Sequence, residues 1–215
     1  MYTNKDVANL RKQTGAGIMK CKEALEKNDG DMDKAKDYLR KKGVAAAEKK
    51  SGRIASEGAI GSYVHLGGKI GVLVEVNSET DFVAKNSEFK KLVKDIAVHI
   101  SASNPQYVKR EDVPKEELDK EREVLKEQVI QEGKPENIAD KIVEGKIDKY
   151  LEKICLMEQP FVKDYDKTVK EVIEDKTLTI GEKISIRRFT RYELGEGLEK
   201  RQENFAEEVQ KQIKK

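Results

Sequence analysis

The sequence predicts an α+β fold: a small N-terminal three-helix domain, then a core domain with a small antiparallel sheet, flanking helices and a long helical hairpin. Three observations favour this prediction. Apolar residues recur at helical spacing through residues 1–43 and again through 86–157. The segments 58–76 and 183–193 alternate instead, as strands do. A length of 215 residues leaves room for one or two domains.

The first domain, residues 1–43, contains three short helical patterns. Thr3 and Asp6 fit a capping box at the start of the first helix. A glycine-containing break and a turn rich in Asn and Asp separate the three patterns, and Gly43 fits a C-cap on the third. The basic, alanine-rich segment 44–57 is expected to be a linker with some helical character.

The core domain, residues 58–200, begins with two alternating runs around Gly67-Gly68, which together predict a β-hairpin. A strongly amphipathic helix is expected next, with Asn86 or Ser87 as its N-cap and Asn104-Pro105 as its end. Its apolar face consists of Phe89, Leu92, Val93, Ile96, Ala97 and Ile100.

Two long, highly charged helices are expected over residues 115–132 and 136–157. Each carries one narrow apolar stripe, so we expect an antiparallel helical hairpin that projects from the body of the protein. A short helix around residues 169–173, the strand 183–193 and a last helix in the C-terminal segment 201–215 complete the prediction.

The charge balance argues against several classes of protein. Forty-three Lys and Arg residues oppose 41 Asp and Glu residues, whereas nucleic-acid binders lean clearly basic, so we expect no direct nucleic-acid partner. No apolar run approaches the roughly 20 residues that cross a bilayer, and the N-terminus lacks a signal-peptide pattern. The two cysteines are far apart, which fits a reducing compartment. We therefore expect a cytoplasmic protein without a membrane partner.

Motifs for catalysis are scarce. The sequence has no phosphate-binding P-loop, and its two histidines, His65 and His99, are too few for a multi-histidine metal site. Cys21 and Cys155 lie on or beside helical apolar stripes, so we expect both to be core residues. We therefore expect no catalytic residues, no cofactor and no metal.

The segment Thr80-Asp81-Phe82-Val83, here called the TDFV segment, does not fit a purely structural role. It follows a predicted strand and precedes a predicted helix, so we expect an exposed connection. Connections on the surface are usually polar, whereas this one carries an aromatic and a branched apolar residue. Two interpretations stay open: Phe82 packs back onto the core, or it is an exposed anchor for a partner protein.

Several segments match one family, in order, over nearly the whole chain. Residues 10–22 read LRKQTGAGIMKCK, and residues 75–85 read EVNSETDFVAK. Shorter matches occur at His99-Ile100, 132–135 and 158–162. In these segments the chain closely resembles the elongation factor Ts family, whose corresponding patterns are LRxxTGAGxMxCK and EVNxxTDFVA.

The resemblance implies a ubiquitin-associated-like module for the first domain and a core or dimerisation domain for the rest. Longer members carry two core subdomains in tandem, and this chain has room for one. Short members work as homodimers, so a second copy is expected to replace the missing subdomain. Some short members have a dimer-linking cysteine where this chain has Thr190, so a dimer here would depend on packing and strand pairing.

The resemblance also implies a guanine-nucleotide exchange factor for the translational GTPase elongation factor Tu. Such a factor promotes GDP release by displacing Mg²⁺ and switch contacts, binds the nucleotide-free GTPase and catalyses no covalent step. Asp81 and Phe82, with Thr80 and Val83 beside them, would meet the GTPase near its Mg²⁺ and switch regions. Phe82 would wedge into an apolar crevice on that partner.

Three residues outside the TDFV segment are implied to support this contact. His99 would support the wedge, and Ile18 and Met19 would pack against a helix beside the nucleotide-base pocket. Core packing is an alternative for Ile18 and Met19 because they begin a short helix. The sequence also leaves open whether His99 faces the core or the surface.

Three other hypotheses stay open. An RNA- or ribosome-associated protein is suggested by short basic clusters at residues 40–42, 49–50 and 187–188. An enzyme with an unrecognised site would use Cys155 or His99. A helical adaptor would bind a ubiquitin-like fold through the first 43 residues alone, in which case Phe82 would not matter.

Overall fold

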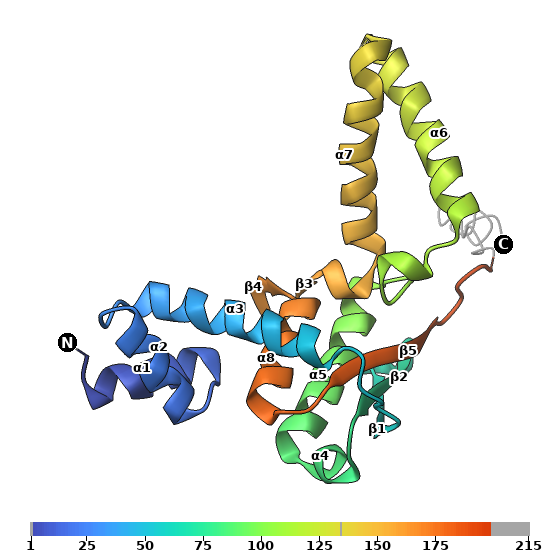
Figure 1. Cartoon of the computed structure of the whole chain (residues 1–215). Helices are drawn as coiled ribbons and strands as arrows, with labels where there is room; N and C mark the ends of the chain where they lie inside the picture. The colour runs from blue at the N-terminus through green and yellow to red at the C-terminus, as the bar shows by residue number, and fades with distance from the viewer. Residues whose placement is uncertain (1, 134, 199–215) are drawn as a thin grey trace, which may run out of the picture.

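The computed structural model describes residues 2–133 and 135–198. These residues form a helical N-terminal module, a central antiparallel sheet packed against helices, and a projecting pair of long helices (Figure 1). The α+β prediction is confirmed. The last helix expected in the segment 201–215 lies outside the described residues.

The N-terminal module consists of α1 (Asn4–Thr14), α2 (Ile18–Lys27) and α3 (Met32–Lys50). Thr3 Oγ1 accepts the backbone N–H of Asp6, and the Asp6 carboxylate accepts that of Thr3, so the expected capping box is confirmed. The three helices enclose a small core of Val7, Leu10, Ala16, Cys21, Ala24, Leu25, Ala35 and Leu39.

Helix α3 is longer than the sequence pattern predicts. Gly43 lies inside α3 and not at its C-cap, and the helix continues to Lys50 through three consecutive alanines, which are strong helix formers. Gly43 is buried against α8 (Val169–Ile180), where an added Cβ would lie 3.5 Å from Asp175 Oδ1. The glycine therefore permits a close helix contact, and the helical character expected for the segment 44–57 extends as far as Lys50.

The central sheet contains β1 (Glu57–Val64), β2 (Ile70–Ser78) and β5 (Ile184–Glu193), antiparallel and in the order β1-β2-β5. The 3-10 turn η1 (Leu66–Gly68) joins the first two strands, so the predicted hairpin is confirmed. Helix α5 (Ser87–Ser103) packs against β1 and β2. The main core includes Val72, Val74, Val76, Phe89, Leu92, Val93, Ile96, Ile100, Ile173, Ile184 and Ile186.

Helices α6 (Lys115–Gln131) and α7 (Glu136–Ile154) run antiparallel and extend away from the sheet (Figure 1). This arrangement confirms the expected helical hairpin. The pair has its own core, which is separate from that of the sheet and consists of Val113, Val129, Ala139, Val143, Ile147, Leu151, Ile154 and Cys155.

Four short elements flank the helical hairpin and α8: η2 (Arg110–Asp112), η3 (Leu156–Glu158), β3 (Pro160–Phe161) and β4 (Asp164–Thr168). Strands β3 and β4 form a second sheet that the sequence analysis did not predict. The reason is that β4 is mostly polar and largely exposed, so it lacks the alternation that marks a strand. Helix α8 also extends well beyond the predicted residues 169–173.

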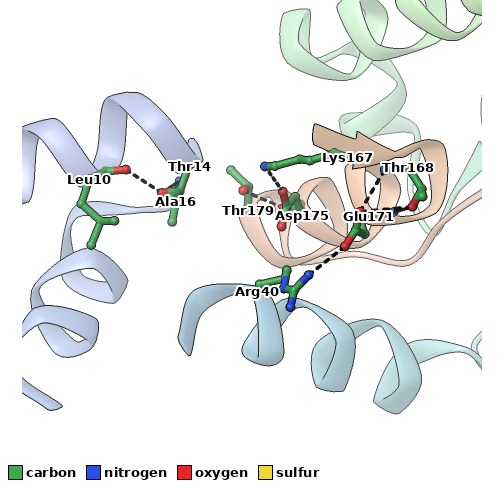
Figure 2. Close-up of polar contacts among 9 residues, drawn as sticks. All are labelled: Leu10, Thr14, Ala16, Arg40, Lys167, Thr168, Glu171, Asp175 and Thr179. Carbon is green, nitrogen blue, oxygen red and sulfur yellow. Dashed lines mark hydrogen bonds and ion pairs between the residues drawn. The ribbon is translucent and has the colours of Figure 1, made fainter. Parts of the chain in front are cut away.

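The N-terminal module contacts the core along α8, largely through polar groups. Arg40 Nη1 on α3 lies 3.2 Å from Glu171 Oε1 on α8 (Figure 2). Lys20 Nζ on α2 donates to the carbonyl oxygen of Leu178 near the end of the same helix. Together with the packing at Gly43, these contacts place the module beside α8.

Candidate functional site

The TDFV segment lies at a corner between β2 and α5, where it forms the start of α4 (Asp81–Lys85) (Figure 1). Thr80 is the N-cap residue of α4. Asn86 ends α4 and caps α5, because its side chain accepts the Glu88 N–H at 2.7 Å. The expected connection is therefore a short helix held between two ordered elements.

Phe82 and Val83 point in different directions from α4. Val83 is only 9% exposed and belongs to the main core, whereas Phe82 is 81% exposed. Successive helical residues differ by about 100° around the axis, so burying Val83 turns Phe82 away from the core. The interpretation that Phe82 packs back onto the core is wrong, and the exposed aromatic fits an anchor for a partner.

Asp81 is half-exposed beside Phe82 and forms an ion pair within α4. Lys85 Nζ lies 2.6 Å from Asp81 Oδ2. The hydrogen bond from Lys85 lowers the pKa of the Asp81 carboxyl below its ordinary value, so this side chain is anionic at neutral pH. The corner thus presents an aromatic ring next to a carboxylate that Lys85 partly neutralises.

Two acidic residues that the sequence analysis did not single out hold the N-terminal side of this corner. Glu182 accepts hydrogen bonds from the backbone and the hydroxyl of Thr80, and Glu79 accepts one from the backbone of Lys183. Glu182 lies 102 residues from Thr80 in the chain. The signal that could have located it is the pairing of the predicted strand 183–193 with the strand that precedes the TDFV segment.

His99 is fully buried on α5 and lies apart from the TDFV segment. Twelve residues separate it from the start of α5 at Ser87, a distance of about 18 Å along a helix. Its Nε2 lies 3.0 Å from Gln159 Oε1, and its Nδ1 accepts the Val162 N–H at 3.2 Å. Burial lowers the pKa of His99, so the ring is neutral at pH 7. In this position His99 can influence a partner contact only through its neighbours.

Ile18 and Met19 lie on the outer face of α2. Their exposed fractions are 55% and 75%, whereas Cys21 on the same helix is buried in the core of the module. The core-packing alternative therefore holds for Cys21 and is wrong for Ile18 and Met19. Two exposed apolar surfaces result, one on the N-terminal module and one at the α4 corner.

Comparison with known proteins decides the family. A family model described as Elongation factor TS matches residues 21–196. The chain belongs to the elongation factor Ts family. Elongation factor Ts of Alkaliphilus oremlandii is 63% identical over 207 residues, which cover 96% of this chain and 95% of that relative. Elongation factor Ts of Acetivibrio thermocellus is 56% identical over 213 residues, 99% of each chain. That of Heliobacterium modesticaldum is 57% identical over 215 residues, the whole of both chains.

Membership of the elongation factor Ts family makes this protein a translation elongation factor. The resemblance stated from the sequence is confirmed, and the relatives match the N-terminal module as well as the core.

The structure argues against a cysteine-based enzyme. Cys21 and Cys155 are buried, and burial raises the pKa of Cys155 to about 11. A protonated, inaccessible thiol is a poor nucleophile. Among residues 2–133 and 135–198, no group of three or more His, Cys, Asp or Glu side chains is placed to hold a metal ion. None of the helices in these two ranges combines the length and the apolar composition that a membrane span requires.

The basic cluster on β5 is partly neutralised inside the protein. Arg187 Nη1 and Arg188 Nε lie 3.0 and 2.7 Å from the two carboxylate oxygens of Glu75. Hydrogen bonds from Arg187 and Arg188 lower the pKa of Glu75 to about 2, so this carboxylate stays charged. The pairing weakens the hypothesis of an RNA-binding patch at this cluster.

Proposed function

We propose that this protein is a guanine-nucleotide exchange factor that binds elongation factor Tu and promotes GDP release. The observation that carries the proposal is the exposed Phe82 at the corner formed by α4. An aromatic side chain presented on an anchored helix loses little conformational freedom on binding, which suits it to insertion into a partner. The factor performs no covalent chemistry and needs no cofactor, and its expected compartment is the cytoplasm, where this GTPase acts.

Exchange follows from linkage between two ligands of the GTPase. The factor must bind the nucleotide-free GTPase more tightly than the GDP-bound form, and GDP then weakens binding of the factor by the same amount. Burying a phenylalanine is worth roughly 1.5–3 kcal/mol. If Phe82 is buried only when the nucleotide site has opened, this energy is available for driving GDP release.

The carboxylate of Asp81 adds an electrostatic contribution. In this proposal it approaches the Mg²⁺ and switch region of the GTPase, with Thr80 and Val83 holding α4 in place. Mg²⁺ would neutralise phosphate charge on a bound nucleotide, so displacing its contacts would weaken nucleotide binding. Lys85 shields the carboxylate in the free factor, and the ion pair is exposed enough to exchange partners on binding.

A second contact through the N-terminal module would strengthen the first. Ile18 and Met19 are exposed on a ubiquitin-associated-like module, residues 1–43, which α3 connects to the core as a continuous helix. A rigid connection fixes the distance between the two contact surfaces. Once one surface is bound, the other is held at high effective concentration. His99 would contribute indirectly, by fixing the packing of α5.

The decisive experiment measures release of a fluorescent GDP analogue from elongation factor Tu, with excess unlabelled GDP and catalytic amounts of this protein. We expect strong acceleration by the wild type and a decrease of about tenfold to a hundredfold in Phe82→Ala. Leu66→Ala is the matched control, because Leu66 is 87% exposed at the opposite end of the β1-β2 hairpin. A folded wild-type protein that leaves GDP release unchanged would refute the proposal.

We also propose that the protein is a homodimer that associates through the outer face of its central sheet. Ile60, Val64, Leu73 and Tyr192 are exposed on this face, and α5 packs on the other. In the strand register Leu73 lies between Ser62 and Thr190, and Gly71 lies between Val64 and Tyr192. Apolar side chains from all three strands therefore share this face, with the charged pair Glu75 and Arg188 beside them. A second copy presents the same patch and can cover it by two-fold symmetry.

A further inference from the structure

The register of the central sheet brings the TDFV segment next to a turn from a distant part of the chain. Strands β2 and β5 are antiparallel, and Ser78 at the end of β2 pairs with Ile184 at the start of β5. The residues that leave β2 therefore lie beside those that enter β5. As a result Glu79 and Thr80 face the turn Gly181–Lys183, which joins α8 to β5.

Glu182 in this turn binds Thr80 through both of its carboxylate oxygens. The Thr80 backbone N–H donates to Oε2 at 3.0 Å, and the Thr80 hydroxyl donates to Oε1 at 2.7 Å. The hydroxyl is thereby used for the contact with Glu182 and does not cap α4. Hydrogen bonds to a charged acceptor are stronger than neutral ones, so the pair fixes both the backbone and the side chain at the start of α4.

Glu79 makes a contact in the opposite direction, from the segment before α4 to the backbone of the turn between α8 and β5. Its Oε1 accepts the Lys183 backbone N–H at 2.6 Å, and its Oε2 lies 3.1 Å from Arg53 Nη1. The hydrogen bond from the Lys183 backbone lowers the pKa of Glu79 below its ordinary value, so the carboxylate stays ionised. The two glutamates therefore connect the β2–α4 and α8–β5 junctions in both directions.

The turn itself is well anchored, which makes it a suitable support. Gly181 ends α8 in a left-handed conformation (φ +91°), and its N–H donates to the Thr177 carbonyl at 3.0 Å. Lys183 Nζ donates to the carbonyl oxygens of Ser51 and Arg53 at 2.6 and 2.9 Å. The turn is thus attached to α8 on one side and to the segment after α3 on the other.

We propose that Glu182 is a positioning residue that holds α4 in the orientation needed to present Phe82 to the GTPase. This inference rests on the exchange function proposed above. A single-turn helix is not stable by itself, so the direction of Phe82 depends on what holds the ends of α4. Val83 and Asn86 anchor its C-terminal part, and Glu182 anchors its N-terminal part through Thr80.

Without Glu182, we expect a smaller fraction of molecules to hold α4 in the orientation that presents Phe82 for binding. Apparent affinity falls in proportion to that fraction, whereas the bound complex still contains an inserted Phe82. Glu182→Ala should therefore raise the concentration of factor that gives half-maximal GDP release by about tenfold, with little change in the rate at saturation. Phe82→Ala should instead lower the rate at saturation, because the wedge itself is missing.

Three further variants sharpen the test. Glu182→Gln should restore the half-maximal concentration to within about twofold, because its amide group still offers an acceptor and a donor to Thr80. Thr80→Val removes only the hydroxyl contact with Glu182 and should raise the half-maximal concentration of the factor about threefold. Glu144→Ala is the matched control, since Glu144 lies on α7, away from this junction, and forms an exposed ion pair with Arg122. It should behave as the wild type.

A measurement without the GTPase separates this inference from the exchange function. Amide hydrogen exchange of the full-length protein should show loss of protection in Glu182→Ala at Thr80 and Ala84, whose N–H groups donate to Glu182 and to the Thr80 carbonyl, while the amides of α5 remain protected. This result would support the positioning role even if the wild type failed to release GDP. Unchanged protection at these amides, or a lowered rate at saturation with an unchanged half-maximal concentration, would overturn it. If Glu182→Ala does not fold, the same two readouts on Thr80→Val decide the question.

Discussion

His99 Nε2 donates to Gln159 Oε1 across 3.0 Å, and both side chains are buried. The direction follows from the neighbouring groups. The Val162 N–H can only donate, so Nδ1 accepts and the proton lies on Nε2. The Gln159 amide nitrogen donates to the Lys153 carbonyl at 2.6 Å, which leaves its oxygen for the histidine. The neutral ring thus joins α5 to Gln159, which lies between η3 and β3 and reaches the end of α7, and to the loop after β3.

This contact predicts a pH-dependent stability. Burial lowers the pKa of His99 below its ordinary value of 6.5, although the hydrogen bond to Gln159 opposes the shift. Below pH 6.5 the unfolded chain therefore binds more protons than the folded one. The contribution of His99 is fully present above that pH and is lost as the pH falls through it toward the lowered folded pKa. We expect denaturant midpoints of the wild type to decrease over this range.

The replacement His99→Gln removes the titrating group and should flatten the pH profile of stability between about pH 7 and pH 5. His65→Gln is the control, because His65 is exposed on the hairpin. It should keep the slope of the wild type. A profile for His99→Gln with the same slope as the wild type would show that another group is responsible.

Asp81→Ala should change how exchange depends on Mg²⁺. Without the carboxylate the factor no longer weakens the contacts of Mg²⁺ with the bound nucleotide, so we expect its acceleration of GDP release to fall more steeply as Mg²⁺ increases. The measurement is the GDP-release rate over a series of Mg²⁺ concentrations. Lys85→Ala breaks the same ion pair but keeps the carboxylate. It should follow the wild-type dependence, and equal curves for all three proteins would contradict the role of Asp81.

Leu73→Lys should convert the proposed dimer into a monomer. Leu73 is on the middle strand at the centre of the exposed apolar patch, where two-fold association would bring like charges together in a desolvated contact. Sedimentation analysis measures the change in mass. Tyr165→Lys introduces the same charge at an exposed site on β4, in the separate two-stranded sheet, and should remain dimeric. A monomeric wild-type protein would count against the dimer.

Ile147→Ala should destabilise the helical hairpin more than the sheet. Ile147 is buried between α6 and α7, and removing such a side chain costs about 2–5 kcal/mol of unfolding free energy. Ile138 lies on the same helix but is exposed, so Ile138→Ala should cost much less. Because the hairpin has a core of its own, loss of amide protection should be concentrated in α6 and α7. Equal loss of protection in α5 would show that the two cores unfold together.

Most of the secondary structure could be predicted because its signals are local. The amphipathic pattern and its two asparagines locate α5, whose ends at Asn86 and Asn104 agree with the prediction. The strand β4 and the extension of α3 past Gly43 could not be predicted in the same way. One is a polar strand that forms through pairing with β3, and the other contains a glycine that serves a helix contact with α8.

The residues of the candidate site also divide into those that local sequence signals predict and those that depend on tertiary packing. The motif around Phe82 marks the segment, and its apolar character in an expected surface connection already raised the question of a partner. The positions of Ile18 and Met19 on the outer face of α2 were not decided by their spacing, because a short helix gives too few turns to define one apolar side. Glu182 carries no recognisable motif at all, and its contact with Thr80 appears only after the strands are paired.

Local sequence patterns were enough to predict the helices with strong periodicity, the β-hairpin, the family and the segment in which the proposed contact lies. These features depend on residues that are close together in the sequence and on motifs that can be recognised without knowledge of the fold. The folded arrangement was needed to show that Phe82 faces solvent, that His99 is buried beside Gln159, and that Glu182 binds Thr80. Exposure and hydrogen bonds between distant residues are set when strand register and helix packing bring separate parts of the chain together.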